Sequence, residues 1–306
     1  MGKRSWGATR PYRLKNVTAE KRAWIDLRAE IELIIEEEGG LDPLITKEYF
    51  VRWARLVRMR GKFGLRAHVL AKRGVEGQPI TRLDEVLSDE FKRIEGEFRK
   101  ILRVIQKHSS SGRWLASQTG VGPISTVGLE SFVDISRCEH VSSLWQFVGL
   151  GSPKKTWNGL MRTCMHQLGD SIIVNQNLPD CYYGQLYRLC RETVNQKNEE
   201  GRYSHIAKTL PGVEDGKVWS VVLRNIARKE MLRILVSHYH AVRKMSETGR
   251  LPSIPYSATV KEDVDLVPIP NSFGAPELGG MIAQYNARLA DAGRIVLLSP
   301  IATYIS

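Results

Sequence analysis

Residues 84–107 read DEVLSDEFKRIEGEFRKILRVIQK, and this stretch decides the fold class of the chain. Its apolar residues recur every three or four positions, which is the spacing of one face of an α-helix, while the opposite face is heavily charged. The apolar face consists of Val86, Leu87, Phe91, Ile94, Phe98, Ile101, Leu102 and Ile105. We therefore predict a long amphipathic helix over 84–107 and a chain that is mainly α.

Two further helices precede this one. Thr18 is a typical N-cap residue, and apolar residues at helical spacing follow it as far as Gly39-Gly40, a pair that favours a helix end. A second helix is predicted over about 46–60. We interpret 18–110 as a helical coiled-coil region, either a hairpin that packs on itself or an arm that also forms a homodimer. The basic segment 1–17 before it is predicted to be an N-terminal arm.

The net charge is unusually positive. Of 306 residues, 45 are Lys or Arg and 33 are Asp or Glu, which gives +12. Residues 1–110 hold 24 basic and 16 acidic residues, and residues 111–250 hold 18 and 12. Such an excess favours a polyanionic partner, nucleic acid first. Residues 251–306 hold only 3 basic and 5 acidic residues, so we expect this small, irregular C-terminal extension to have another role. Within it, one helix and a short apolar strand are predicted over 276–306.

The densest basic window lies between Glu48 and Glu76, which are separated by no acidic residue. Gly61 and Gly64 within it predict a turn that permits close backbone approach. Phosphate contact is expected from Arg52, Arg55, Arg58, Arg60, Lys62, Arg66, Lys72 and Arg73.

A second unit is predicted over 111–250, after a linker at Ser109–Gly112. Gly120-Val121-Gly122-Pro123 lies between two helical patterns and resembles a helix-hairpin-helix turn. In such a turn the backbone N–H groups of Gly120 and Gly122 can point at a phosphate, and Arg113 lies close before it. Gly-rich turns also join helices for purely structural reasons, and this alternative stays open.

The stretch from Asp134-Ile135-Ser136 through Ser142–Trp145 to Phe147–Leu150 resembles a known family. It is similar to the C-terminal domain of insertion-sequence transposases that pair a RuvC-like domain with a serine-bearing transposase domain. Weaker similarity continues at Leu160–Thr163, Tyr183–Tyr187 and Ala227–Leu235. Two features of that family are missing: the acidic RuvC-like domain, and the Ser-Gly segment after Gly149-Leu150, where Ser152 is followed by Pro.

A basic helical arm followed by such a domain also resembles the Nop domain of box C/D ribonucleoproteins. The chain is similar to the Tas proteins of TIGR (tandem interspaced guide RNA) systems, of the kind without a nuclease domain. This resemblance implies a Nop-like all-helical domain, a guide RNA and double-stranded target DNA as partners, and RNA-guided recognition without cleavage. The alternatives are a diverged transposase or recombinase, and a DNA-binding protein that needs no RNA.

The second unit supplies further candidate contacts. In the Nop comparison, a loop just after Gly149-Leu150 meets the RNA, where Lys154 and Lys155 suit phosphate and Trp157 suits stacking on a base. A side chain that anchors the hydrophobic core is the alternative for Trp157. Arg162 follows one turn after Asn158. An amphipathic helix over about 217–245 is predicted to carry Arg224, Arg228, Lys229 and Arg233 on its polar face. Arg224, Arg228 and Arg233 would form a ridge along a nucleic-acid backbone, and an exposed helix without a ligand is the alternative.

No catalytic residue, metal ligand or cofactor is predicted. His238 and His240 lie two apart, as do Cys164 and His166, so each pair would point to different sides of a helix. None of the four cysteines forms a C-x-x-C pair, and no apolar run is long enough to cross a bilayer. We expect a cytoplasmic protein of a prokaryotic or phage-infected cell, with no membrane partner.

Overall fold

The computed structural model describes residues 18–38, 41–75, 78–151, 157–209, 217–254, 265–270, 274–292 and 294–295. Within these ranges the chain is mainly α-helical, as predicted. The predicted N-terminal arm at 1–17 lies outside them. None of the helices in these ranges combines the length and the apolar character that a membrane span requires.

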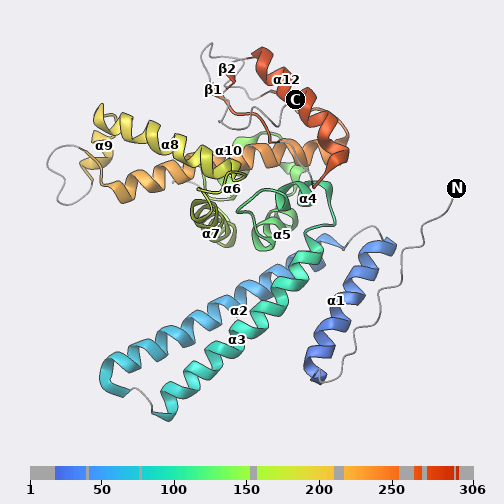
Figure 1. Ribbon diagram of the computed structural model, residues 1–306, viewed down its shortest axis with the longest axis vertical. Helices are drawn as coiled ribbons and strands as arrows, with labels where there is room; N and C mark the ends of the chain where they lie inside the picture. The colour runs from blue at the N-terminus through green and yellow to red at the C-terminus, as the bar shows by residue number, and fades with distance from the viewer. Residues whose placement is uncertain are drawn as a thin grey trace.

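The helices fall into three consecutive groups (Figure 1). The first contains α1 (Ala19–Glu38), α2 (Pro43–Leu70), the π-helical turn η1 (Ala71–Val75) and α3 (Pro79–Ile105). The second contains α4 (Ser110–Ala116), α5 (Pro123–Phe132), η2 (Ile135–Arg137), α6 (Val141–Phe147), α7 (Gly159–Val174), α8 (Tyr182–Glu199), α9 (Ser204–Ala207) and α10 (Ser220–Thr248). The third contains β1 (Asp265–Leu266), η3 (Pro276–Leu278), α12 (Gly279–Ala292) and β2 (Arg294–Ile295).

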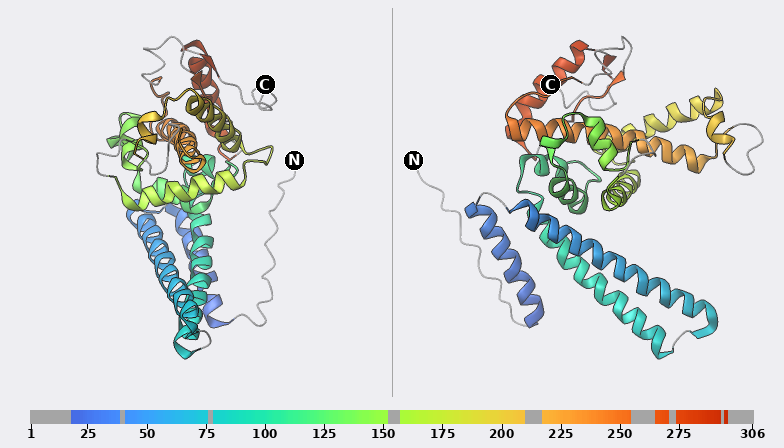
Figure 2. Two further views of the ribbon diagram at one scale, coloured as in Figure 1. Left: turned by 90° about the vertical axis from the view of Figure 1, so that its left-hand side faces the viewer. Right: turned by 180° about the vertical axis from the view of Figure 1, so that it is seen from behind.

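α2 and α3 form a long antiparallel hairpin that projects from the rest of the molecule (Figures 1 and 2). The Asp42 side chain caps α2, whose first residue is a proline, and Gly74 breaks the helix at its far end with a φ of 75°. The Phe63 and Phe91 rings stack across the hairpin at 5.6 Å. α1 packs along α3, where the Trp24 ring meets the Phe98 ring at 5.7 Å.

The predicted end of the second helix near residue 60 is wrong, because α2 continues to Leu70. Gly61 and Gly64 therefore lie inside a helix and not in a turn. Each glycine costs a helix only about 1 kcal/mol relative to alanine, which packing along the hairpin outweighs. A Cβ atom on Gly64 would lie 3.4 Å from the Ser88 hydroxyl, so this glycine sits where α2 closely approaches α3.

The predicted linker at Ser109–Gly112 is also wrong. The Ser109 hydroxyl accepts a hydrogen bond from the Gly112 backbone N–H at 2.8 Å and thereby caps α4. Gly112 is buried, and a Cβ atom there would lie 2.4 Å from the Gln106 carbonyl oxygen. A run of small polar residues resembles a linker in sequence. Here the small side chains allow the end of α3 and the start of α4 to pack closely.

α10 is the central helix of the second group, and α4, α6, α7 and α8 pack around it. Its apolar side chains are buried along most of its length, among them Met231, Leu235 and Tyr239. The hydrophobic core is continuous from the base of the hairpin, at Phe50 and Ile101, into this group. We call the second group, α4 to α10, the body; the hairpin is joined to it by this shared core.

The C-terminal extension contains the 14-residue helix α12, in the region where one helix is predicted, and a short parallel pairing of β1 with β2. Three buried side chains of the body hold residues 267–270. The Trp114 indole donates to the Pro270 carbonyl at 3.2 Å, and the Tyr182 hydroxyl donates to the Pro268 carbonyl at 2.5 Å. His238 contacts the Val267 carbonyl at 3.0 Å. The extension is therefore part of the folded body.

Candidate nucleic-acid interface

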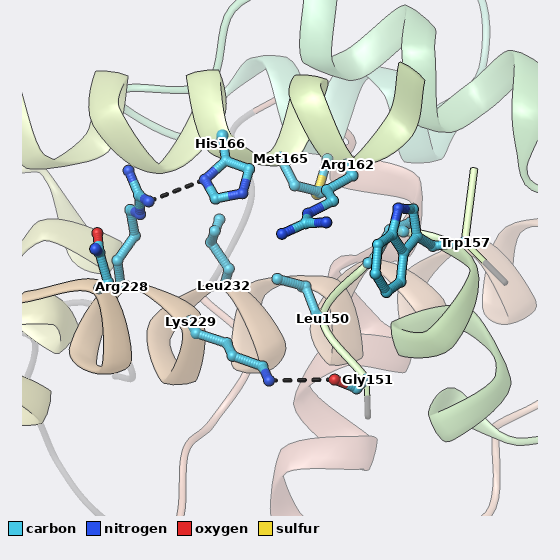
Figure 3. Close-up of a pocket in the computed structure, with 12 residues that line it drawn as sticks. Leu150, Gly151, Trp157, Arg162, Met165, His166, Arg228, Lys229 and Leu232 are labelled. Atoms are coloured by element: carbon cyan, nitrogen blue, oxygen red, sulfur yellow. Dashed lines mark hydrogen bonds between the residues drawn. The ribbon is translucent and has the colours of Figure 1, made fainter. Parts of the chain in front are cut away.

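A cavity of about 340 Å³ lies between α7, the first half of α10 and the loop before α7 (Figure 3). Its walls bring together four residues that the sequence singled out: Trp157, Arg162, Arg228 and Lys229. The other lining residues are Val148, Gly149, Leu150, Gly151, Met165, His166, Asn225 and Leu232. None of the described residues that line this cavity is a carboxylate. We call it the basic pocket.

Local sequence explains how the loop and α7 form one side of the basic pocket. The Asn158 side chain caps α7 by accepting from the backbone N–H groups of Leu160 and Met161 at 3.0 and 3.1 Å. Gly149 has a φ of 82°, and a Cβ atom there would lie 2.8 Å from the Arg162 side chain. A glycine is thus required both by the backbone and by the aliphatic stem of Arg162 that packs on it.

The Arg162 guanidinium lies over the Trp157 ring, with 4.5 Å between its central carbon and the ring centroid. This cation–π contact fixes a positive charge beside an indole that remains 37 % exposed. Within the parts of the chain that the structure describes, no carboxylate pairs with Arg162. The pair offers a charged group and an aromatic surface side by side, which are the two contacts an unpaired nucleotide needs.

Arg228 forms the back wall of the basic pocket. Its guanidinium donates to the Asp170 carboxylate at 2.6 Å and to His166 Nδ1 at 2.9 Å, and its side chain is only 13 % exposed. A Cβ atom on Gly169 would lie 2.8 Å from the Arg228 side chain, so this glycine makes room for the arginine. Arg228 is therefore held within the protein, and its main effect is to position His166.

Lys229 and His166 both have lowered pKa values in the basic pocket. The Lys229 ammonium donates to the Gly151 carbonyl at 3.2 Å, and burial, followed by Arg233 and Arg162, lowers its pKa. Burial, followed by Arg228 and Arg162, also lowers the pKa of His166. Both shifts arise chiefly from burial, and the neighbouring guanidinium groups add to them.

The predicted ridge on α10 is not formed as a continuous surface. Arg224 is exposed, whereas Arg228 faces α7. Arg233 donates to the Leu150 carbonyl at 2.9 Å and lies over the Trp145 ring at 5.5 Å. Helical spacing placed these residues on one side correctly, but α7 and the loop at 148–151 cover that side.

The basic window on α2 divides into two kinds of residue. Arg60 pairs with Glu95 at 3.1 Å and Arg66 pairs with Asp84 at 2.8 Å, and both carboxylates are buried on α3. These two arginines stabilise the hairpin. The remaining members of the window are exposed: Arg52, Arg55, Arg58, Lys62, Lys72 and Arg73.

The candidate turn residues serve the fold. Gly120 has a φ of 89°, and a Cβ atom there would lie 3.0 Å from the Ile172 backbone. Gly122 is the N-cap of α5 and has open space where a side chain would be. Arg113 donates to the carbonyls of Lys107 and His108 and to Glu277, which ties α3 to the C-terminal extension. The structural alternative thus accounts for Gly120 and Arg113.

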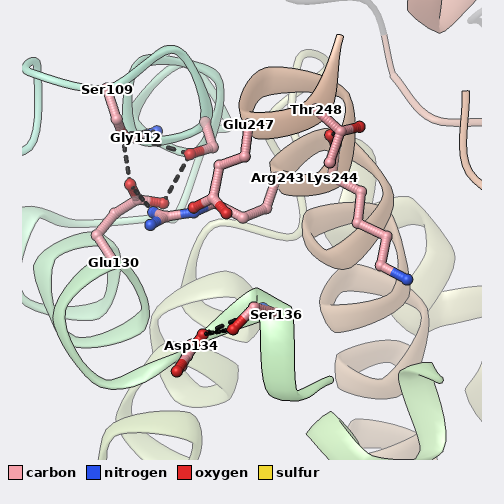
Figure 4. Close-up of polar contacts among 10 residues, drawn as sticks. Ser109, Gly112, Glu130, Asp134, Ser136, Arg243, Lys244, Glu247 and Thr248 are labelled. Atoms are coloured by element: carbon pink, nitrogen blue, oxygen red, sulfur yellow. Dashed lines mark hydrogen bonds and ion pairs between the residues drawn. The ribbon is translucent and has the colours of Figure 1, made fainter. Parts of the chain in front are cut away.

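A second polar cluster lies away from the basic pocket and joins α4, α5 and α10 (Figure 4). The Glu130 carboxylate accepts from the Ser109 and Ser111 hydroxyls and pairs with Arg243, which also pairs with Glu247. Each of these charged groups has a partner of opposite sign. The cluster therefore holds three helices together.

Lys154 and Lys155 lie outside the described residues, so their predicted phosphate contacts stay a prediction. His166 and Asn225 are pocket residues that the sequence reasoning missed. His166 follows Arg162 by four positions, so both occupy one face of α7, and this spacing was the available signal. Asn225 gave no signal, because only the approach of α7 to α10 makes it part of a cavity.

The described residues contain no group of three or more His, Cys, Asp or Glu side chains that could hold a metal ion. Comparison with protein-family models, with curated proteins and with solved structures gives no match for this chain.

Proposed function

We propose that this chain binds a guide RNA and forms a ribonucleoprotein that recognises double-stranded DNA by base pairing of the guide, without a nuclease of its own. The basic pocket is the observation that carries the RNA-binding part. It joins an exposed indole to cationic side chains from two helices, and its described lining residues include no carboxylate. Stacking on an aromatic ring beside a phosphate contact is how proteins hold unpaired RNA.

The charge distribution supports the same proposal. The exposed cations of the α2–α3 hairpin add a second basic surface to the basic pocket. A protein that leaves sequence reading to a guide needs contacts to phosphates and to shape over a long path, and two separated basic surfaces suit that need. The guide and the DNA target themselves come from the resemblance to the Tas proteins.

The direct test is to purify the chain from its native host and to extract and sequence the bound nucleic acid. We expect one discrete class of short RNA, and DNA binding that is lost after ribonuclease treatment. Recovery of no discrete short RNA would refute the proposal.

Two other functions give different results in the same preparation. A DNA-binding protein that needs no RNA would keep its affinity and sequence preference for duplex DNA after ribonuclease treatment. A diverged transposase or recombinase would cut or join DNA strands in the presence of Mg²⁺, and would lose that activity on removal of a single carboxylate or of Ser152.

A further inference from the structure

The hydrogen-bonding character of the basic pocket is defined by the contact between Arg228 and His166. A guanidinium can only donate, so His166 Nδ1, at 2.9 Å from Arg228, must be the acceptor. The ring proton therefore resides on Nε2, and Figure 3 shows this second ring nitrogen on the side of Arg162 and Leu232. His166 thus offers the cavity a donor and not an acceptor.

The charged side chains of the basic pocket are donors as well. Arg162 and Lys229 carry only N–H groups, and Lys229 uses one of them on the Gly151 carbonyl. A ligand that accepts hydrogen bonds from these three side chains must present several acceptor oxygens, as a phosphate group does. A stacked or duplex base would not fill such a site, because its edge mixes donors and acceptors.

We propose that the basic pocket takes one unpaired nucleotide of the bound RNA, with its phosphate among Arg162, Lys229 and His166 and its base on the exposed Trp157 surface. This inference rests on the proposed function and narrows it to a nucleotide displaced from any helix. A base inside a duplex is already stacked on both sides and cannot reach Trp157. The protein would therefore favour an RNA with a bulge or a single-stranded junction over a continuous helix.

The test compares two RNA hairpins that are identical except for one bulged uridine. Binding is measured by fluorescence anisotropy on the full chain after removal of host RNA in high salt. We expect the bulged hairpin to bind about tenfold more tightly, because stacking of one base on an aromatic ring contributes about 1–3 kcal/mol. Trp157→Leu should abolish this preference by weakening the binding of the bulged hairpin about tenfold.

A pair of charge variants distinguishes binding in the basic pocket from general electrostatic attraction between the protein and RNA. Arg162→Gln should reduce the preference for the bulged hairpin, whereas Arg137→Gln removes a cation that is 86 % exposed outside the pocket and should leave the preference unchanged. Equal binding of both hairpins by the unaltered chain would overturn this inference and leave the proposed function standing. Failure of both hairpins to bind, together with no RNA in the native preparation, would overturn both.

Discussion

His238 makes the stability of the body depend on pH in a direction that the structure fixes. The imidazole is fully buried, and burial lowers its pKa from 6.5 to about 4. Its Nε2 lies 3.0 Å from the Val267 carbonyl, so Nε2 is the donor and Nδ1 accepts from the Tyr183 hydroxyl at 3.0 Å. Both nitrogens are satisfied in the neutral ring, and protonation would bury a positive charge.

The sign follows from proton counting. Between pH 6.5 and pH 4 the unfolded chain binds a proton at His238 that the folded chain does not, so the free energy of unfolding falls as the pH falls. With these two pKa values, the loss from neutral pH is about 2 kcal/mol at pH 5 and about 3 kcal/mol at pH 4. The stabilisation is fully present above pH 6.5.

The assay is urea unfolding followed by tryptophan fluorescence, repeated from pH 7.5 to pH 4.5 on the unaltered chain and on His238→Gln. Trp114 is a suitable reporter because its indole bonds to Pro270 in the same segment that His238 holds. The variant should be less stable at pH 7.5, but its stability should fall by about 2 kcal/mol less on the way to pH 5. Parallel pH profiles for the two proteins would refute the reasoning.

Three further predictions concern backbone geometry, a buried ion pair and an exposed cation. Gly120→Ala should lower the free energy of unfolding by about 1–3 kcal/mol, because φ is 89° and the new Cβ atom would lie 3.0 Å from the Ile172 backbone on α7. Gly122→Ala, where a Cβ atom meets open space, is the matched control in the same urea titration. Arg66→Gln should lower the free energy of unfolding by about 1–3 kcal/mol, because it leaves the buried Asp84 carboxylate without its partner. The double variant Arg66→Gln with Asp84→Asn should recover part of that stability. Arg55→Gln, on the exposed side of α2, should leave stability unchanged and reduce the slope of log Kd against log salt for RNA by about 0.7, and an unchanged slope would exclude Arg55 from the interface.

The sequence predicts the hairpin and the pocket residues for one physical reason. Helical periodicity is a local property, so α3 was recognised from its apolar repeat, and Trp157 and Arg162 were grouped from their neighbourhood in the chain. Their joint position beside Lys229 comes from the approach of α7 to α10, which no local pattern in the sequence encodes.

Long-range pairing explains what the sequence did not reveal. The window around Arg60 and Arg66 has no acidic neighbour in the chain, yet its partners Glu95 and Asp84 lie on the antiparallel helix. Arg228 likewise has its partner on α7, 58 positions away. A count of local charge cannot separate cations that stabilise the fold from cations that remain for a ligand.

α10 constrains how this chain can change over evolution. Its first half lines the basic pocket through Arg228 and Lys229, and its second half holds the C-terminal extension through His238. Each residue of an α-helix turns its successors by about 100°. A single insertion between these two halves would rotate His238 away from Val267 or the pocket cations away from α7. The number of residues in α10 between Lys229 and His238 is therefore constrained more strongly than the identity of any exposed residue between them.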